Sequence, residues 1–438
     1  MKKSIHIILF SLLIAQYSLA QQISGIRVKG LVTDSNGSGL PYVSIGVKSN
    51  ASIGSFTNSG GKFEIYIPAY VAGDSLLFSC IGFDVSRIKI DPTKKDSIKV
   101  VMSAKIYILN EIVLGTDSAE NLVRKSVAML SSTLPHNRYI MQGFFREIVR
   151  SRHTYDRLIE AAVDVFDKGY KPGEGNNDFD FRIREMRKSE DYMDLDWMAA
   201  ILNYISPKNG LHGNNAEAIF LHDYIRNHKS IFFELMNASL NDAFMEFADL
   251  SVDSMIVFNN EKLFCIGIQP RYPKGDLLPW GTIHIREKDL AIIQMEYYLK
   301  PGCQKAKMLL VPDTDFIIHT LIRYKDYEGK MYPTLIYRKS FRQQGNQTKP
   351  GGNPNDDLFF DEKFFMVNDI LTEKNNTKRF RNKDKQNGKA DLYNEEWTYN
   401  EDFWKTYNAV TETPLQPHVK NSLEREKSLE SQYKGSHE

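Results

Sequence analysis

The chain has 438 residues, and its 56 Lys and Arg side chains nearly balance 55 Asp and Glu side chains, for a formal charge of +1. So balanced a surface exerts no long-range attraction on nucleic acid or anionic lipid, and a nucleic-acid partner is excluded on this ground. The length exceeds what one hydrophobic core usually serves, so we expect two or three domains. Only three cysteines occur, which excludes a disulfide framework.

The first twenty residues have the three parts of a secretory signal. Lys2 and Lys3 provide positive charge, residues 5–15 form an apolar run, and residues 18–20 (Ser-Leu-Ala) are a small-x-small cleavage site. The apolar run is shorter than the roughly 20 residues that span a bilayer, so we expect cleavage rather than anchoring. We therefore expect an exported protein of the periplasm or of the outer-membrane periphery, with no transmembrane segment after cleavage.

Residues 26–115 predict short strands separated by turns. Apolar side chains alternate at residues 28–32, 43–47 and 63–67, and residues 57–62 (Thr-Asn-Ser-Gly-Gly-Lys) tolerate the positive φ of a turn. Strands at this spacing are typical of a β-sandwich.

Several stretches of this region resemble a known family. Residues 39–45 (Gly-Leu-Pro-Tyr-Val-Ser-Ile), 54–63 and 79–83 (Ser-Cys-Ile-Gly-Phe) are similar to the carboxypeptidase-regulatory-like domain common in Bacteroidetes envelope proteins. Residues 109–113 resemble the closing strand of that domain. The resemblance implies a non-catalytic accessory sandwich of the Ig- or transthyretin-like kind, and it implies no peptidase activity.

A helix is expected after the sandwich. Asp117 or Ser118 can cap it, an apolar stripe runs from Leu122 to Leu130, and Pro135 ends it.

The next segments alternate between strand and helix patterns. Residues 139–149 predict a strand, whereas residues 155–167 fit a helix or a returning strand. Residues 168–177 predict a Gly-rich loop, and residues 194–205 and 214–226 predict helices.

From residue 249 onward the pattern predicts an antiparallel meander. Turn residues separate paired apolar runs, as at Asn259-Asn260-Glu261 and at Glu328-Gly329. We expect a curved sheet of about seven strands, with the preceding helices available to cover one face. The expected strands are residues 254–258, 262–268, 281–286, 291–299, 316–327, 330–341 and 359–367.

This second region resembles the part that follows the sandwich in uncharacterised Bacteroidetes proteins, at residues 143–147 (Gly-Phe-Phe-Arg-Glu), 281–285 and 400–408. Its strand order is also similar, by analogy only, to the half-barrel of lipoprotein carriers. Residues 372–392 predict a mobile loop. Residues 419–433 predict a charged helix with Leu423 and Leu429 as its few apolar contacts.

The expected fold class is therefore mainly β with α, a β-sandwich followed by an α+β domain with a curved antiparallel sheet. The expected organisation is a signal peptide at residues 1–20, the sandwich at 21–115, the α+β domain at 116–370, and a mobile loop with a helical tail at 371–438.

His284 and Glu287 have the His-x-x-Glu spacing that zinc carboxypeptidases use, which makes them the best metal candidate. Those enzymes also need a third, distant ligand and a water held by a carboxylate. Strand alternation points the two side chains to opposite faces, so a polar strand residue is favoured over a zinc ligand. His153 lies in a loop motif and is a weaker candidate.

Other catalytic patterns are missing from the sequence. It contains no Gly-x-Ser-x-Gly elbow, no His-Glu-x-x-His pair and no phosphate loop. The adjacent carboxylates Glu395-Glu396 and Glu401-Asp402 are typical of solvated charges. The basic run at 378–383 is typical of a solvated loop rather than a nucleic-acid or phospholipid contact. We expect no enzymatic activity, no cofactor, and no catalytic, cofactor-binding or metal-binding residues.

The cysteines suggest structural roles. Cys80 shares a strand face with Leu76 and Phe78, and we expect a buried free thiol. Cys265 and Cys303 can pair in an oxidising compartment or stay free, and the sequence leaves both alternatives open.

Binding is the remaining function. A curved sheet must cover its inner face with helices or with a ligand, and Phe232, Phe233, Phe244 and Phe247 can line such a groove, although a packed core is their commoner use. We expect an envelope binding or assembly protein whose partner is an envelope protein or a lipid, with peripheral membrane contact left open. A half-barrel carrier of a lipid or other apolar ligand is the alternative, and a metal-dependent hydrolase is the third hypothesis.

Overall fold

The computed structural model describes residues 25–91, 93, 97–105, 118–150, 154–172, 179–192, 215–228, 240–272, 277–303, 315–343, 358–373, 392–410 and 421–435. Several predicted features lie outside these residues: the signal peptide, the closing strand at 109–113, the helix at 194–205, most of the loop at 372–392 with its basic run, Phe232, Phe233 and His153.

The chain folds into two compact units. The sandwich unit comprises Met1–Ser79, Val85–Met102 and Thr406–Thr411, and the sheet unit comprises Cys80–Asp84, Ser103–Lys405 and Glu412–Glu438. None of the described helices is long and apolar enough to span a membrane.

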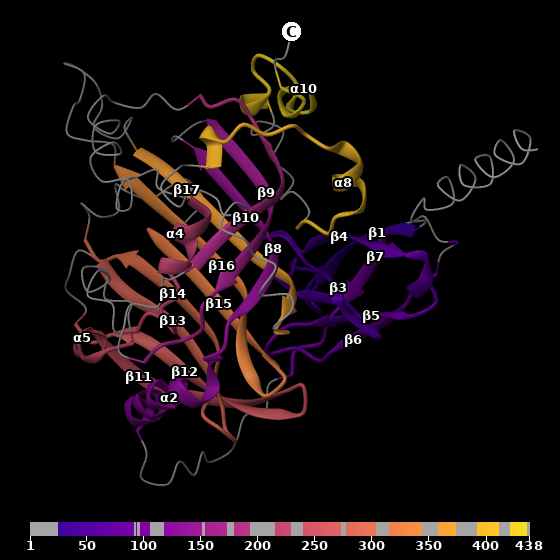
Figure 1. The fold of residues 1–438 in the computed structure, drawn as a ribbon. Helices are drawn as coiled ribbons and strands as arrows, with labels where there is room; N and C mark the ends of the chain where they lie inside the picture. Colours follow the sequence, from indigo (N-terminus) through magenta and orange to yellow (C-terminus); the bar gives the residue numbers. More distant parts are fainter. Residues whose placement is uncertain are drawn as a thin grey trace, which may run out of the picture. The chain divides into compact units, whose positions relative to one another are not determined.

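The described residues of the sandwich unit form two sheets (Figure 1). The first has the order β4-β1-β7, in which β1 pairs antiparallel with β4 and parallel with β7. The second has the order β3-β2-β5-β6 and is antiparallel. The elements are β1 (Gly25–Thr33), β2 (Ser44–Val47), β3 (Asn50–Phe56), β4 (Lys62–Pro68), the short helix η1 (Ala69–Val71), β5 (Ser75–Ser79), β6 (Ser86–Lys89) and β7 (Ile98–Val101).

Alternating apolar side chains hold the two sheets together. Ile65 and Ile67 on β4 are fully buried, as the alternation predicts. The rings of Phe63 on β4 and Phe78 on β5 meet edge to face, with centroids 5.3 Å apart, and so join one sheet to the other. The strands predicted at 28–32, 43–47 and 63–67 are thereby confirmed.

The turn before β4 depends on side-chain hydrogen bonds and on glycine. Asn58 Oδ1 accepts hydrogen bonds from the backbone N–H groups of Gly60 and Lys62, each at 3.0 Å. Gly61 has a φ of +80°, and a Cβ there would lie 2.4 Å from the carbonyl oxygen of Val32. Only glycine fits this conformation without displacing β1.

A segment from the C-terminal region completes the sandwich unit at the edge of β4. The backbone N–H of Tyr66 donates to Asn408 Oδ1 at 2.6 Å, and Asn408 Nδ2 donates to the Tyr66 carbonyl oxygen at 3.2 Å. One side-chain amide therefore satisfies both backbone groups that this residue of an edge strand would otherwise leave unpaired.

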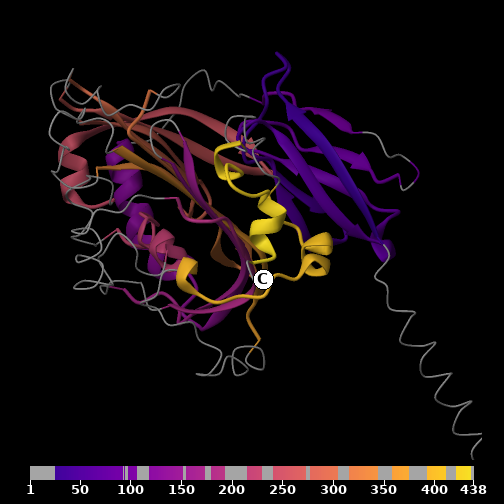
Figure 2. The same ribbon diagram turned by 90° about the horizontal axis from the view of Figure 1, so that it is seen from above.

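The described part of the sheet unit forms one antiparallel sheet of ten strands, in the order β10-β9-β8-β17-β16-β15-β14-β13-β12-β11 (Figures 1 and 2). The strands are β8 (Tyr139–Arg150), β9 (Tyr155–Asp167), β10 (Phe179–Lys188), β11 (Ala248–Phe258), β12 (Glu261–Pro270), β13 (Leu277–Arg286), β14 (Ile292–Pro301), β15 (Ile318–Tyr327), β16 (Lys330–Gln343) and β17 (Leu358–Leu371).

The expected fold class is confirmed, but the expected number of about seven strands is too low. The seven meander strands are present as β11 to β17, and β17 then pairs with β8, which brings β9 and β10 into the same sheet. Residues 155–167, left open between helix and strand, form β9. β10 has no counterpart in the sequence prediction.

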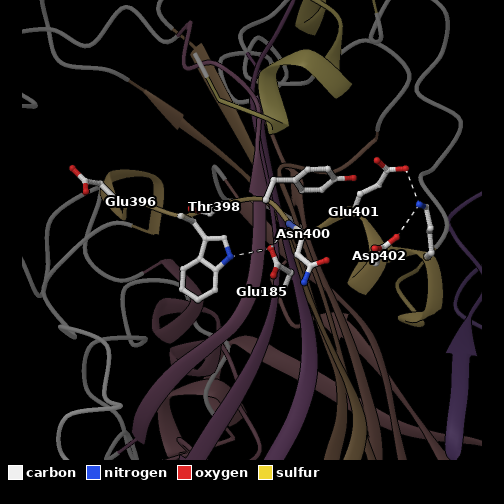
Figure 3. A pocket seen from close by; sticks show the side chains of 9 residues that line it. Glu185, Glu396, Thr398, Asn400, Glu401 and Asp402 are labelled. Carbon is white, nitrogen blue, oxygen red and sulfur yellow. Dashed lines mark hydrogen bonds and ion pairs between the residues drawn. The ribbon is translucent and has the colours of Figure 1, made fainter. Parts of the chain in front are cut away.

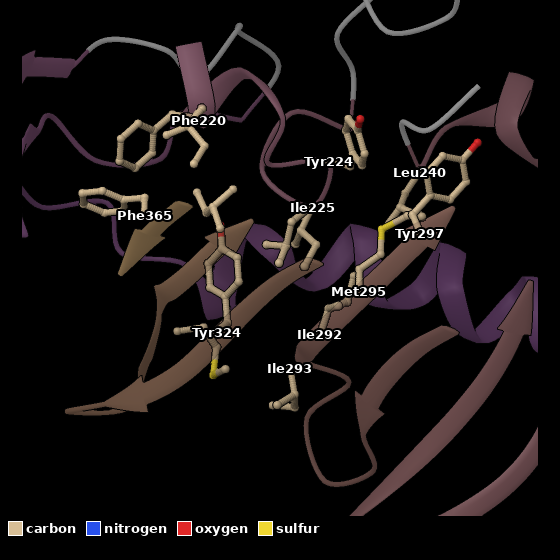
Figure 4. Packing of buried hydrophobic residues seen from close by; sticks show 14 of the residues in the cluster. Phe220, Tyr224, Ile225, Leu240, Ile292, Ile293, Met295, Tyr297, Tyr324 and Phe365 are labelled. Atoms are coloured by element: carbon tan, nitrogen blue, oxygen red, sulfur yellow. The ribbon is translucent and has the colours of Figure 1, made fainter. Parts of the chain in front are cut away.

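Helices cover the inner face of the curved sheet. They are α2 (Ala119–Thr133), which Ser118 caps as expected, α4 (Asn215–Leu221) and α5 (Asp242–Phe247). The helix expected at 214–226 is shorter, because tight turns follow Leu221. Phe220 of α4 meets Phe365 of β17 at 4.9 Å between ring centroids (Figure 4). The described inner face is therefore packed with side chains of the protein itself.

Buried polar groups are embedded in this inner core. Arg226 donates to both carboxylate oxygens of Asp167, at 2.5 and 2.9 Å, and to the hydroxyl of Tyr139 at 3.2 Å. Tyr324 donates to Asp223, and burial nevertheless raises the pKa of that carboxyl group. Each buried charge of this kind must be hydrogen-bonded, because an unpaired one would cost several kcal/mol.

The outer face of β8, β9 and β10 is also covered. Glu160 of β9 is fully buried between Arg146 of β8, whose Nε lies 2.6 Å away, and Arg187 of β10, whose Nε lies 2.5 Å away. The indole of Trp404 covers the Arg187 guanidinium at 4.4 Å. The C-terminal region thus shields a charged network from water.

The predicted helix at 419–433 is wrong as a continuous element. Residues 421–423 are helical, turns follow them, and a separate short helix, α10, covers Leu429–Tyr433 with Ser428 as its cap. Glu424 accepts a hydrogen bond from the backbone N–H of Leu429, which holds the irregular turn before this helix. Leu423 and Leu429 are buried as apolar contacts, as expected.

Candidate binding pocket at the β10 edge

An open pocket lies where the C-terminal region passes the edge strand β10. We call residues 392–405 the wrap segment; it includes the short helix η4 (Leu392–Asn394) and most of α8 (Glu401–Thr406). The pocket has a volume of about 820 Å³. It is lined by Glu185 of β10 and by Glu396, Trp397, Thr398, Tyr399, Asn400, Glu401, Asp402 and Lys405 of the wrap segment.

Glu185 anchors the wrap segment to the strand. Its Oε1 accepts hydrogen bonds from Trp397 Nε1 at 2.9 Å and from the backbone N–H of Asn400 at 3.3 Å, besides that of the adjacent Met186 at 3.2 Å. A bulge between Ile183 and Glu185 sets this side chain on the outer face of the sheet, opposite Ala162. Figure 3 shows Glu185 beside Asn400, with Glu396 on one side and Glu401 and Asp402 on the other.

The second carboxylate oxygen of Glu185 is uncommitted. Only 5% of this residue is exposed, yet Oε2 accepts no hydrogen bond and makes no ion pair within the described part of the chain. Solvent reaches Oε2, since it is not among the buried polar atoms that lack a hydrogen bond, so a donor from outside the chain can reach it as well.

The pocket is strongly acidic. Four carboxylates and one ammonium line it, for a formal charge of −3. Lys405 pairs with Glu401 at 3.1 Å and with Asp402 at 2.9 Å. Glu396 makes no hydrogen bond or ion pair among the described residues. The negative potential therefore concentrates around Glu185 and Glu396.

Aromatic side chains of the wrap segment cover cations of β10 on both sides of Glu185. Lys188 Nζ lies 4.8 Å from the ring centroid of Tyr393 and donates to the carbonyl oxygens of Tyr393 and Glu395. The Arg184 guanidinium lies 6.0 Å from the ring of Phe403. Cation–aromatic contact is therefore the recurring chemistry of this interface.

A comparison with protein-family models identifies the domain that forms the sandwich unit. Residues 28–114 match the family model of the CarboxypepD_reg-like domain. The sandwich is a carboxypeptidase-regulatory-like domain. The resemblance inferred from residues 39–45, 54–63 and 79–83 is thereby confirmed.

Three solved structures show distant likenesses to the chain. No curated protein matches its sequence. A LolA superfamily protein from Nitrosomonas europaea is 10% identical with a TM-score of 0.22, covering 59% of this chain and 95% of its own. The MucA/MucB complex of Pseudomonas aeruginosa gives 9% identity and a TM-score of 0.17, covering 60% and 96%. A putative membrane-associated protein of unknown function from Bacteroides fragilis gives 9% identity and a TM-score of 0.15, covering 79% and 98%. TM-scores this low carry no functional argument.

The candidate metal pair lies in the sheet unit, outside the carboxypeptidase-regulatory-like domain, and does not converge. His284 is on β13, where burial lowers its pKa to about 4. Glu287 follows β13, is 43% exposed in its side chain, and lies 3.8 Å from Lys262. Within the described ranges, no three His, Cys, Asp or Glu side chains gather as metal ligands would.

A second polar cluster, which sequence reasoning missed, lies on the outer face of β14 and β15. Glu296 Oε1 accepts from the Tyr298 hydroxyl at 2.6 Å and lies 2.9 Å from His319 Nε2. The His319 ring stacks on Tyr298 at 4.2 Å. Burial would raise the pKa of Glu296, but the hydrogen bonds from His319 and Tyr298 outweigh it, and the pKa is lowered. These groups satisfy one another.

The remaining predicted residues have structural positions. Phe244 is fully buried in the core, while Phe247 is 43% exposed. All three cysteines are free, so the Cys265–Cys303 pair is not formed. Cys80 is only half-buried, because it follows the end of β5, whereas Cys265 is buried.

Proposed function

We propose that this is an exported, non-enzymatic binding protein. In this proposal the carboxypeptidase-regulatory-like domain is an accessory sandwich, and the sheet unit presents the pocket at the β10 edge to a partner. The observation that carries the proposal is the buried Glu185 carboxylate, which uses Oε1 to build the pocket and leaves Oε2 without a donor. Because solvent reaches Oε2, this oxygen is open to a hydrogen-bond donor of a ligand.

The packing of the inner face favours this proposal over a carrier of apolar ligands. Tyr139, Phe145, Tyr297 and Phe365 are fully buried there against each other and against the helices. An acyl chain would have to displace side chains that already pack against one another in the described core. A carrier of apolar ligands stays the second candidate, because the curved sheet of this protein, with helices on its inner face, suits an internal ligand.

The polar clusters favour binding over catalysis. A hydrolase needs a nucleophile or activated water, a base, and donors aimed at one reacting atom. His284 and Glu287 do not meet, and Glu296, Tyr298 and His319 are hydrogen-bonded to one another. Export to the periplasm or the outer-membrane periphery rests on the signal pattern of residues 1–20.

Native mass spectrometry of the mature chain, purified gently from its own envelope, tests this function. The proposal predicts a co-purifying protein at near-unit stoichiometry with no bound lipid. A bound lipid at near-unit stoichiometry would replace the proposal with the carrier. A bare chain at micromolar concentration would contradict a stable complex of either kind.

A further inference from the structure

We propose that the pocket at the β10 edge binds a basic side chain, Lys or Arg, displayed by a partner protein. This inference rests on the proposed binding function and names the chemistry of its ligand.

Cations of β10 lie against aromatic rings of the wrap segment, and Glu185 departs from this pattern. Along β10, Arg184, Arg187 and Lys188 each lie against an aromatic ring of the C-terminal region. Between them stands Glu185, which faces Trp397 with a carboxylate instead of a cation. At this position the interface supplies an aromatic wall and an acid, while the one ammonium lining the pocket, that of Lys405, pairs with Glu401 and Asp402.

The group that fits beside Glu185, Glu396 and Trp397 is a hydrogen-bond donor with positive charge. Glu185 Oε2 is an acceptor with no donor among the described residues, and Glu396 is a carboxylate with no cation beside it. Trp397 is 38% exposed and commits only its Nε1 to Glu185, which leaves its ring faces for a cation. An ammonium or guanidinium group satisfies all three features at once.

The charge of the pocket favours a basic side chain over a lipid headgroup. An aminophospholipid carries a phosphate next to its amine, and the pocket's formal charge of −3 repels that phosphate. The pocket also opens widely to solvent, so it would bury too little of a small free amine to hold it tightly. A basic side chain on a protein surface brings surrounding contacts with it.

Isothermal titration of the full mature chain with short oligolysine and oligoarginine peptides tests this assignment, with oligoglutamine as the uncharged control. Glu185→Gln keeps a hydrogen-bond acceptor for Trp397 and removes the charge, so we expect affinity to fall about tenfold or more. Glu396→Lys reverses an exposed charge that holds no structural contact and should lower affinity to a similar degree. It also decides the result if Glu185→Gln folds poorly.

Glu287→Gln and Glu287→Lys are the matched controls, because Glu287 is an exposed carboxylate outside the pocket. We expect both to bind the basic peptides as the unaltered chain does. Equal affinity in the pocket variants and the controls would overturn the inference, as would equal binding of oligoglutamine. Phosphatidylethanolamine vesicles that bind only when Glu185 and Glu396 are intact, without peptide binding, would assign the pocket to a lipid instead. None of these outcomes decides the proposed binding function, because native mass spectrometry of the purified chain tests that function separately.

Discussion

Glu185 and Trp397 are 212 residues apart in the sequence, and a 2.9 Å hydrogen bond from the indole Nε1 to Oε1 joins them. This bond fixes the wrap segment on the outer edge of the sheet. It also orients the carboxylate so that the other oxygen faces the pocket. The residue that holds the pocket together is therefore the one expected to receive the ligand.

Replacing Glu185 by Ala should loosen the wrap segment. The change removes the acceptor of the Trp397 and Asn400 N–H groups, and each unsatisfied group costs about 1–3 kcal/mol if it stays buried. Hydrogen–deuterium exchange should show faster exchange over residues 396–402 than in the unaltered chain. Glu185→Gln should keep most of the protection, and equal exchange in both variants would contradict the anchoring role.

The buried Glu160 should matter most for the stability of the sheet unit. Glu160→Gln leaves the guanidinium groups of Arg146 and Arg187 without their counter-charge, and we expect a loss of roughly 3 kcal/mol in the free energy of unfolding. Glu430→Gln, which alters an exposed pair with Lys434, should leave the midpoint of urea unfolding unchanged. Equal midpoints of urea unfolding for the two variants would refute the stabilising role of the Glu160 network.

The same carboxylate should make stability depend on pH. Burial alone would raise the pKa of Glu160, but Arg146 and Arg187 outweigh burial and lower it below the ordinary value of 4.5. A lowered folded-state pKa stabilises the protein above about pH 4.5, and this stabilisation is lost as pH falls through the folded-state pKa. Urea titrations at descending pH should show a smaller acid loss for Glu160→Gln than for the unaltered chain.

The carboxypeptidase-regulatory-like domain offers a matched pair of glycines. Gly61→Ala places a Cβ 2.4 Å from the Val32 carbonyl oxygen at a φ of +80°, and we expect a loss of about 1–3 kcal/mol. Gly73→Ala meets nothing within 4 Å and should change stability by at most about 0.5 kcal/mol. Thermal unfolding followed by circular dichroism measures both. Similar melting temperatures would show that the Gly61 turn tolerates a side chain.

Strands with an apolar face opposite a solvated face were predictable from the sequence, because alternation and turn chemistry depend only on neighbouring residues. Asn259 and Asn260 form the expected turn with positive φ between β11 and β12. β9 was ambiguous because Glu160, Ala161 and Ala162 favour a helix by propensity, whereas the alternation of polar and apolar residues fits a strand.

β10 and the pocket could not be derived from local pattern. Arg182, Arg184 and Arg187 resemble solvated charges in the sequence, but aromatic residues about 200 positions later cover two of them. Glu401 and Asp402 are exposed as expected, and only the tertiary fold brings them together with Glu185.

Quantitative affinity purification from the native envelope tests the central claim most directly, with the tagged unaltered chain compared with Glu396→Lys and Glu287→Lys. The account predicts one partner protein at near-unit stoichiometry with the unaltered chain and with Glu287→Lys, and its loss with Glu396→Lys. Retention of the same partner by Glu396→Lys, at the same stoichiometry, would contradict the assignment of the β10 pocket as the binding site.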